Sequence, residues 1–242
     1  MIIKVVNPNT SAEMTALVER SAKAVAAAGT SVHAVSPAMG PESIESHYDE
    51  ALSVPGLLTE IAAGEQSGVD GYVVACFGDP GLDAARELAA GPVVGIAEAA
   101  MRTAAYLGRG FTVVTTLSRT RGRAWELAER YGMRGLCRGV HACDIPVLEL
   151  DRDPGALGVV TAACARAVEE DGADAVVLGC AGMTDWAPSI SAAIGVPVVD
   201  GVQSAVLTVQ ALVEMGLRTG KRDEFALPRP KRYAGLLRDF GY

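Results

Sequence analysis

Two cysteines end matching apolar segments of this sequence, and their spacing makes them the first candidates for chemistry. Cys76 closes the run DGYVVAC that starts at Asp70, and Cys180 closes the related run DAVVLGC. A single cysteine at the end of a strand is most often a small apolar filler. Two thiols at equivalent positions of a repeat suggest an acid/base pair, because a thiolate can remove a proton from one face of a carbon while a thiol protonates the other face. Such a pair inverts a carbon next to a carbonyl, and it needs no metal or organic cofactor.

The residues after each cysteine form a turn and then a predicted helix start. Asp79 can cap the first of these helices, and Thr184 or Asp185 can cap the second. A thiol beside a helix N-terminus meets donor N–H groups and a positive partial charge, so we expect both thiols to have a pKa below the ordinary value of ~8.5. The other three cysteines have no matching partner and are interpreted as buried apolar residues: Cys137, Cys143 and Cys164.

Short β-branched runs alternate with Ala-rich segments along the whole chain. This alternation predicts an α/β fold with mostly parallel sheets that are flanked by helices. The predicted strands are Ile2–Val6, Ser31–Val35, Gly71–Cys76, Val93–Ile96, Phe111–Thr115, Val140–Cys143, Ala175–Gly179 and Val196–Val199. The predicted helices are Ser11–Ala28, Val54–Gln66, Leu82–Ala90, Ala99–Leu107, Arg121–Tyr131, Ala156–Asp171, Trp186–Ile194 and Val202–Met215.

The second half of the strand pattern repeats the first half. Residues 4–6 return as residues 112–114, and residues 32–35 return as residues 140–143, each 108 positions later. The two cysteine runs are 104 positions apart, and residues 91–94 return near residues 196–199, 105 positions later. Four matches in the same order predict two pseudo-symmetric lobes, with residues 1–97 plus 205–242 in the first and residues 98–204 in the second. Ligands of parallel sheets bind beyond the carboxyl ends of the strands, so we expect the active site in the cleft between the lobes.

Polar and small residues at the predicted strand ends are candidates for substrate contact. Asn9 follows the first strand, and Thr115 with Thr116 ends its repeat. Helix capping is the ordinary role of such residues and competes with this interpretation. Glycines beside a thiol let the backbone approach a ligand, and exposed amides there can hold an enolate oxygen. The remaining candidates for substrate contact are Ile44, Phe77, Gly179, Ala181 and Gly182.

The composition excludes several classes of protein. The formal net charge of −8 and the absence of any Lys/Arg run argue against nucleic-acid or anionic-membrane partners. No signal peptide or 18-residue uncharged apolar span is visible, so a cytoplasmic protein is expected. The five cysteines are widely spaced and no C-x-x-C occurs, which disfavours both a disulfide framework and a structural zinc site.

The chain resembles the Asp/Glu/hydantoin racemase superfamily, and within it the hydantoin racemase branch. The resemblance implies cofactor-independent racemisation with Cys76 and Cys180 as the acid/base pair, and it implies a homo-oligomer. It also implies that a 5-monosubstituted hydantoin, or the related ureido compound allantoin, is the substrate. The segments that carry it are Asn7–Thr10, Ser43–Glu45, His47–Ala51, Ala75–Phe77, Asp79–Gly81, Val114–Thr116 and Val177–Met183.

Two departures from the family pattern affect the expected pocket. Gly78 stands where an acidic residue is expected, and Ser46 stands where glycine is expected. An amino-acid racemase of the same fold is an alternative, but the strand-end segments carry few charges and Phe77 lies beside the first thiol, which suits a neutral ring better. A ligand-binding protein without catalysis is the alternative from another class, and the paired thiols argue against it because binding alone does not need them.

Overall fold

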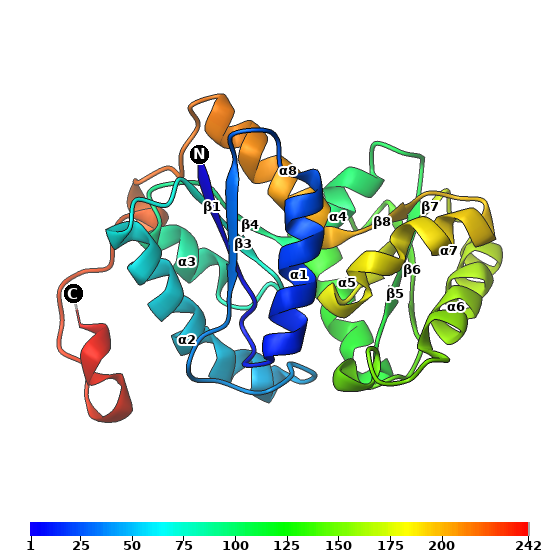
Figure 1. Cartoon of the computed structure of the whole chain (residues 1–242), viewed down its shortest axis with the longest axis horizontal. Coiled ribbons are helices and arrows are strands. Elements are labelled where there is room, and N and C mark those ends of the chain that lie inside the picture. The colour runs from blue at the N-terminus through cyan, green and yellow to red at the C-terminus, as the bar shows by residue number, and fades with distance from the viewer. Residues whose placement is uncertain (242) are drawn as a thin grey trace.

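The computed structural model describes residues 1–241, and it contains two four-stranded parallel sheets (Figure 1). The first sheet has the order β2-β1-β3-β4 and the second has the order β6-β5-β7-β8. The strands are β1 (Ile2–Val6), β2 (Ser31–Val35), β3 (Gly71–Val74), β4 (Val93–Gly95), β5 (Phe111–Thr115), β6 (Cys137–Ala142), β7 (Ala175–Gly179) and β8 (Val198–Val199). The identical order of the two sheets confirms the predicted α/β fold with two pseudo-symmetric lobes.

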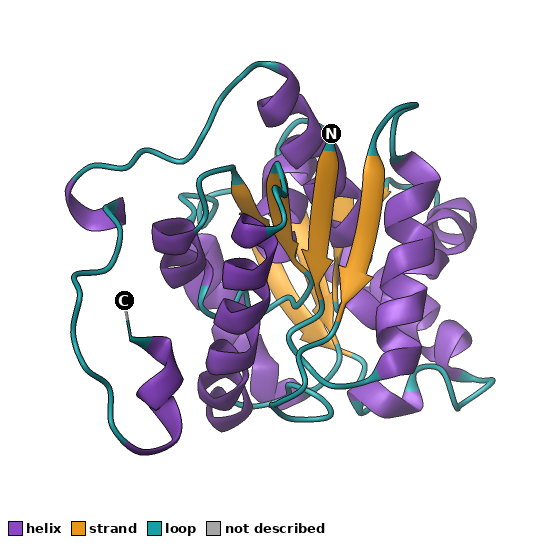
Figure 2. Cartoon of the chain, turned by 60° about the vertical axis from the view of Figure 1, so that its left-hand side comes forward, coloured by secondary structure: helices purple, strands orange, loops and turns teal. Residues whose placement is uncertain are grey.

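Helices cover both faces of each sheet (Figure 2). In the first lobe α1 and α8 pack on one face, whereas α2 and α3 pack on the other. In the second lobe α6 and α7 cover one face, and α4 with α5 the other. The helices are α1 (Ala12–Val25), α2 (His47–Gln66), α3 (Leu82–Leu88), α4 (Ile96–Ala104), α5 (Arg121–Arg130), α6 (Ala156–Asp171), α7 (Ala187–Ile194) and α8 (Gly201–Glu214). Short 3-10 turns are η1 (Ser118–Thr120), η2 (Val147–Glu149), η3 (Ala181–Trp186), η4 (Asp223–Phe225) and η5 (Gly235–Phe240).

The central strands are apolar along their whole length because helices cover them on both sides. Every residue of β3 (GYVV), β5 (FTVVT) and β7 (AVVLG) is buried. Continuous burial of this kind is typical of parallel sheets, in which no face meets solvent. None of the helices within residues 1–241 is long and apolar enough to cross a membrane.

The strand order determines where a ligand can bind. In each sheet the connections leave to opposite sides at the two central strands, β1 and β3 in the first sheet and β5 and β7 in the second. The loops that follow the carboxyl ends of such strands diverge and leave a crevice. Asn9 follows β1 and Cys76 follows β3, whereas Thr116 follows β5 and Cys180 follows β7. The crevices of the two sheets therefore present equivalent residues.

Helix α2 begins at His47, which is seven residues before the predicted start at Val54. The Ser46 hydroxyl accepts a hydrogen bond from the Asp49 N–H at 3.2 Å and donates one to the Asp49 carboxylate at 2.8 Å. This reciprocal cap starts the helix early. Pro55, which the sequence placed in the first turn, lies inside the helix instead. The early start brings residues 47–50 onto the helix beside the crevice.

The last helix returns to the first lobe. Helix α8 follows β8 of the second sheet and packs against α1, β3 and β4 of the first lobe as well as against α4. Its N-cap is Asp200, whose carboxylate accepts the N–H groups of Val202 and Gln203. The exact lobe boundaries at residues 97/98 and 204/205 stay a prediction, and Tyr242 lies outside the described residues.

Candidate active site

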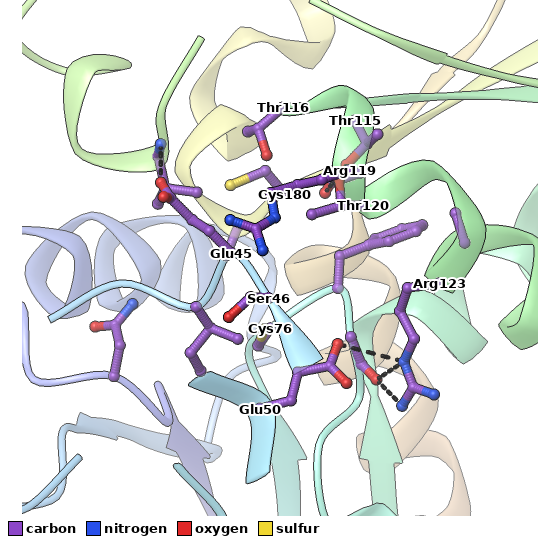
Figure 3. A pocket seen from close by; sticks show the side chains of 18 of the residues that line it. Glu45, Ser46, Glu50, Cys76, Thr115, Thr116, Arg119, Thr120, Arg123 and Cys180 are labelled. Carbon is purple, nitrogen blue, oxygen red and sulfur yellow. Dashed lines mark hydrogen bonds and ion pairs between the residues drawn. The ribbon is translucent and has the colours of Figure 1, made fainter. Parts of the chain in front are cut away.

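One cavity of about 200 Å³ lies between the strand ends of the two sheets (Figure 3). The structure brings nine of the ten predicted site residues to its wall: Asn9, Ile44, Cys76, Phe77, Thr115, Thr116, Gly179, Cys180 and Ala181. Gly182 does not line the cavity. Its backbone N–H instead donates a hydrogen bond to the Sγ of Cys180 at 3.4 Å.

The two thiols have matching surroundings. Cys76 lies two residues after β3, and Cys180 directly follows β7. The backbone N–H of Gly78 faces the Cys76 thiol, just as the N–H of Gly182 faces the Cys180 thiol. In both lobes the amide two residues after the cysteine is therefore placed to stabilise a thiolate. The internal symmetry of the chain extends to these single hydrogen bonds.

Burial dominates the acidity of both thiols and corrects the sequence-based expectation of a lowered pKa. Removal from water raises the pKa of Cys180 to about 12, against the smaller lowering effect of the Gly182 amide. Burial also raises the pKa of Cys76, and the carboxylates of Glu50 and Asp79 raise it further. The helix N-terminus does not offset this rise in pKa, because only one backbone amide reaches each sulfur. Burial therefore disfavours the thiolate form of both cysteines.

Some of the predicted polar side chains already form hydrogen bonds within the protein, whereas others keep a donor for a ligand. The Thr115 hydroxyl donates to the Gly179 carbonyl at 3.3 Å and lies 3.0 Å from the Thr120 hydroxyl, so it is engaged within the protein. The Thr116 hydroxyl makes no hydrogen bond to another residue within 1–241 and points into the cavity in Figure 3. Asn9 donates one amide N–H to the Sδ of Met14 at 3.2 Å, which leaves its second N–H for a ligand.

Gly179 and the apolar candidates shape the wall. A Cβ at Gly179 would lie 2.9 Å from the Cα of Thr115, so glycine allows β7 to lie close to β5 at this point. Phe77, Ile44 and Ala181 supply apolar surface to the cavity. This mixture of an apolar wall and a few free donors suits a small, compact ring with carbonyl groups.

Four charged side chains also line the cavity, and the sequence analysis did not select them: Glu45, Glu50, Arg119 and Arg123. The strand-end segments are indeed poor in charge, but these residues come from the segment before α2, from α2, from η1 and from α5. Their approach depends on how the two lobes pack. The Ser-x-x-Asp cap at Ser46 is the signal that would have placed Glu50 on a helix beside the site.

Glu50 occupies the space that a side chain at position 78 would need. A Cβ on Gly78 would lie 2.4 Å from a carboxylate oxygen of Glu50. The same carboxylate pairs with the Nε of Arg123 at 3.3 Å, and Arg123 also donates to the Gly78 carbonyl at 2.7 Å. At position 78, where glycine replaces the expected acidic residue, the Glu50 carboxylate of α2 fills the space. Its ion pair with Arg123 connects the loop after Cys76 to α5 of the second lobe.

Arg119 is the charged residue of the cavity that has no partner within residues 1–241. Figure 3 shows its guanidinium extending into the cavity among the side chains of Cys180, Thr116 and Ser46. The other charges are engaged, since Glu45 accepts the N–H of Val147 at 2.7 Å and Glu50 pairs with Arg123. A free guanidinium offers a planar fork of donors to oxygen atoms of a ligand.

The Asp79 carboxylate connects the loop after Cys76 to the start of α4 and to Tyr131. Asp79 accepts the N–H groups of Ala97 and Glu98 at the start of α4, at 3.1 and 3.0 Å, and the Tyr131 hydroxyl at 2.6 Å. It therefore caps α4, not α3 as the sequence suggested, and these bonds hold its backbone at a φ of +44°. Burial raises the pKa of Asp79 to about 6 in spite of its three donors.

The second predicted helix start also differs. Cys180 itself caps η3, whereas the Thr184 hydroxyl lies 2.6 Å from the Ser21 hydroxyl of α1 and so joins the lobes. No cluster of three or more His, Cys, Asp or Glu side chains that could hold a metal ion occurs in residues 1–241.

Comparison with known proteins identifies the family. The model of the Asp/Glu/Hydantoin racemase family matches residues 3–209. The chain belongs to this family. A hydantoin racemase of Pseudomonas sp. is 46% identical over 242 residues, which is 100% of this chain and 97% of that protein. A hydantoin racemase of Rhizobium meliloti is 48% identical over 97% of this chain and 98% of its own length.

A solved structure of this family has the same fold throughout. The allantoin racemase from Klebsiella pneumoniae superposes with a TM-score of 0.97 and 48% identity, and the match covers 100% of this chain and 99% of that one. Because these full-length relatives share one activity type, the chain is an enzyme of the racemase class. The racemase relatives also imply a small-molecule substrate.

Proposed function

We propose that this Asp/Glu/hydantoin racemase family member inverts C5 of 5-monosubstituted hydantoins with Cys76 and Cys180 as its two acid/base groups. The observation that carries the proposal is that both thiols, from equivalent strand ends of the two lobes, line one cavity. The curated relatives that are 46% and 48% identical and act on hydantoins support the substrate class.

The reaction needs one thiolate and one thiol at the start, so one of the two cysteines first releases its proton to solvent. The thiolate removes the C5 proton and becomes a thiol, while the electron pair left on carbon is delocalised onto the neighbouring carbonyl as an enolate. The opposite thiol then protonates C5 from the other face and becomes the thiolate. The substrate gains and loses one proton, so its composition is unchanged and the two cysteines exchange roles for the reverse reaction.

The enolate oxygen requires donors that are already in place. Arg119 supplies a free guanidinium, Thr116 a free hydroxyl, and Asn9 a second amide N–H. Donors that already face the reacting atoms stabilise developing charge more strongly than water does. We assign Arg119 the largest contribution to stabilising the enolate, because its guanidinium adds positive charge beside this anionic intermediate.

Allantoin is the second candidate substrate, because the allantoin racemase from Klebsiella pneumoniae is 48% identical. The polar residues on one part of the cavity wall also favour allantoin. Allantoin carries a ureido substituent on the same ring, and Glu45, Ser46 and Arg119 lie where they can face a polar substituent. A larger kcat/KM for allantoin than for 5-isobutylhydantoin would identify the ureido compound as the preferred substrate.

The proposal is tested by incubating one enantiomer of 5-isobutylhydantoin, and separately one of allantoin, in deuterated buffer. The wild type is expected to abolish optical rotation and to introduce deuterium at C5, at rates well above the enzyme-free control. Cys164→Ala is the matched control, because this buried cysteine does not line the cavity, and it should keep activity. If the wild type racemises neither compound, the proposal is wrong.

Arg119→Met tests the enolate-stabilising role. Removal of one such donor typically costs about 10²–10³-fold in kcat, and we expect a loss of about that size, with partial rescue in Arg119→Lys. A matched control is Arg152→Met, which removes an exposed arginine outside the cavity. An unchanged kcat in Arg119→Met would remove Arg119 from the mechanism.

A further inference from the structure

The C-terminal segment leaves the body of the molecule. Thr219 donates to the Gly91 carbonyl at 2.7 Å, and Lys221 donates to the carbonyls of Arg86 and Glu87 at the end of α3. Beyond η4 the chain extends away from the two lobes, as Figures 1 and 2 show for the last residues before the C-terminus. We refer to residues 226–241 as the C-terminal arm. Among the described residues, the one hydrogen bond between the arm and residues 1–225 is the local turn bond from the Ala226 N–H to the Asp223 carbonyl at 3.3 Å.

The arm presents apolar side chains to solvent. Leu236 is 97% exposed, Leu227 is 60% exposed and Leu237 is 44% exposed. The two adjacent leucines lie on the short turn η5, which spans only Gly235–Phe240. A single helical turn of this length is not stable by itself in water. Clustered exposed apolar residues on such a segment indicate a surface that is covered by a partner.

The arm and the body carry opposite charge. Arg229, Lys231, Arg232 and Arg238 outnumber Asp239, so the arm has a formal charge of +3. Because the whole chain has −8, the remaining residues carry −11. The body of this same protein is therefore electrostatically complementary to the arm, and an attraction of this kind orients and accelerates association.

A second uncovered apolar surface lies on the outside of α4 and α8. A shallow groove there is lined by the apolar residues Leu207, Ala211, Leu212 and Met215 and the hydroxyl residues Ser204 and Thr208 of the α8 region, and by Thr103 of α4. Leu207 is 47% exposed and Met215 is 63% exposed. Leu212 is partly buried against the core, so Leu207 and Met215 supply the large exposed apolar side chains of the groove.

We propose that the C-terminal arm of one chain docks in the α4–α8 groove of a second copy of this chain. Apolar contact between Leu236, Leu237 and the groove would supply the binding energy, and the charge difference would favour the approach. Docking within one chain is disfavoured by position. The arm departs from α3, whereas α8 packs on the opposite face of the first sheet. Reciprocal exchange of two arms closes a symmetric dimer.

The test measures mass in solution by light scattering after size-exclusion chromatography, over a hundredfold range of concentration. The full chain should form a dimer or a multiple of it. The arm variant Leu236→Ser/Leu237→Ser and the groove variant Leu207→Ser/Met215→Ser should each dissociate at least tenfold more readily. Leu157→Ser/Val159→Ser on α6 is the control, because it removes two other exposed apolar side chains elsewhere and should leave the mass unchanged.

Mixing separates docking from misfolding. The arm variant keeps an intact groove and the groove variant keeps an intact arm, so an equimolar mixture should form heterodimers that neither variant forms alone. Both variants should retain the circular dichroism of the wild type. A wild type that is monomeric at every concentration would overturn the proposal, and so would an arm variant with unchanged mass. A groove variant that dimerises like the wild type would show that the α4–α8 groove does not receive the arm.

Discussion

The partly buried Cys180 thiol predicts an unusual pH dependence for its alkylation. Its pKa is raised to about 12 because the sulfur is removed from water and only the Gly182 amide compensates. For a single titration, the thiolate fraction at pH 8 is then about 10⁻⁴ and at pH 10 about 10⁻². Since the thiolate is the reactive form, the rate rises about tenfold for each pH unit.

The assay is the reaction of the empty enzyme with iodoacetamide from pH 7 to pH 10.5. Peptide mass spectrometry then quantifies the modification of Cys180. A plot of log rate against pH should have a slope of one and no plateau in this range. The denatured enzyme is the control, and its rate should level off above the ordinary thiol pKa of ~8.5. A plateau in the native enzyme below pH 10 would refute the argument that burial outweighs the local amide.

Two further perturbations follow from the same contacts. Glu50→Gln removes a negative charge that raises the pKa of Cys76, so alkylation of Cys76 at pH 9 should become several-fold faster, whereas the exposed Glu149→Gln should have no effect. An unchanged or slower reaction of Cys76 in Glu50→Gln would contradict this sign. Tyr131→Phe removes the hydroxyl that donates to the Asp79 carboxylate at 2.6 Å, so the free energy of unfolding in urea should fall by about 1.5–3 kcal/mol. Equal urea midpoints for Tyr131→Phe and the wild type would show that this bond between the lobes contributes nothing to stability.

The sequence was sufficient to predict the two-lobe arrangement that positions the site. The repeated runs that end in Cys76 and Cys180 predicted two lobes, and the order of both sheets agrees with that prediction. Nine of the ten selected residues line one cavity because strand ends of parallel sheets meet at one edge, which is a local consequence of the fold class. Their roles as acid/base or substrate contacts stay predictions.

What the sequence could not predict depends on contacts between elements far apart in the chain. Asp79 reaches past its own helix to cap α4, because the second lobe brings Tyr131 and the start of α4 next to it. Arg123 meets Glu50 only where α5 and α2 approach each other. The prediction of a lowered thiol pKa was wrong for the same reason, since the local sequence shows a nearby helix start but does not show how far packing shields these partly exposed thiols from water.

The central claim is that two opposed thiols share one proton transfer at C5. Its most direct test is deuterium exchange at C5 of each separate enantiomer of 5-isobutylhydantoin, followed by mass spectrometry and circular dichroism, with Cys76→Ala and Cys180→Ala. We predict that neither variant changes the optical rotation, and that each exchanges the C5 proton of at most one enantiomer, with opposite preference. Complete racemisation by either variant would contradict the two-thiol account.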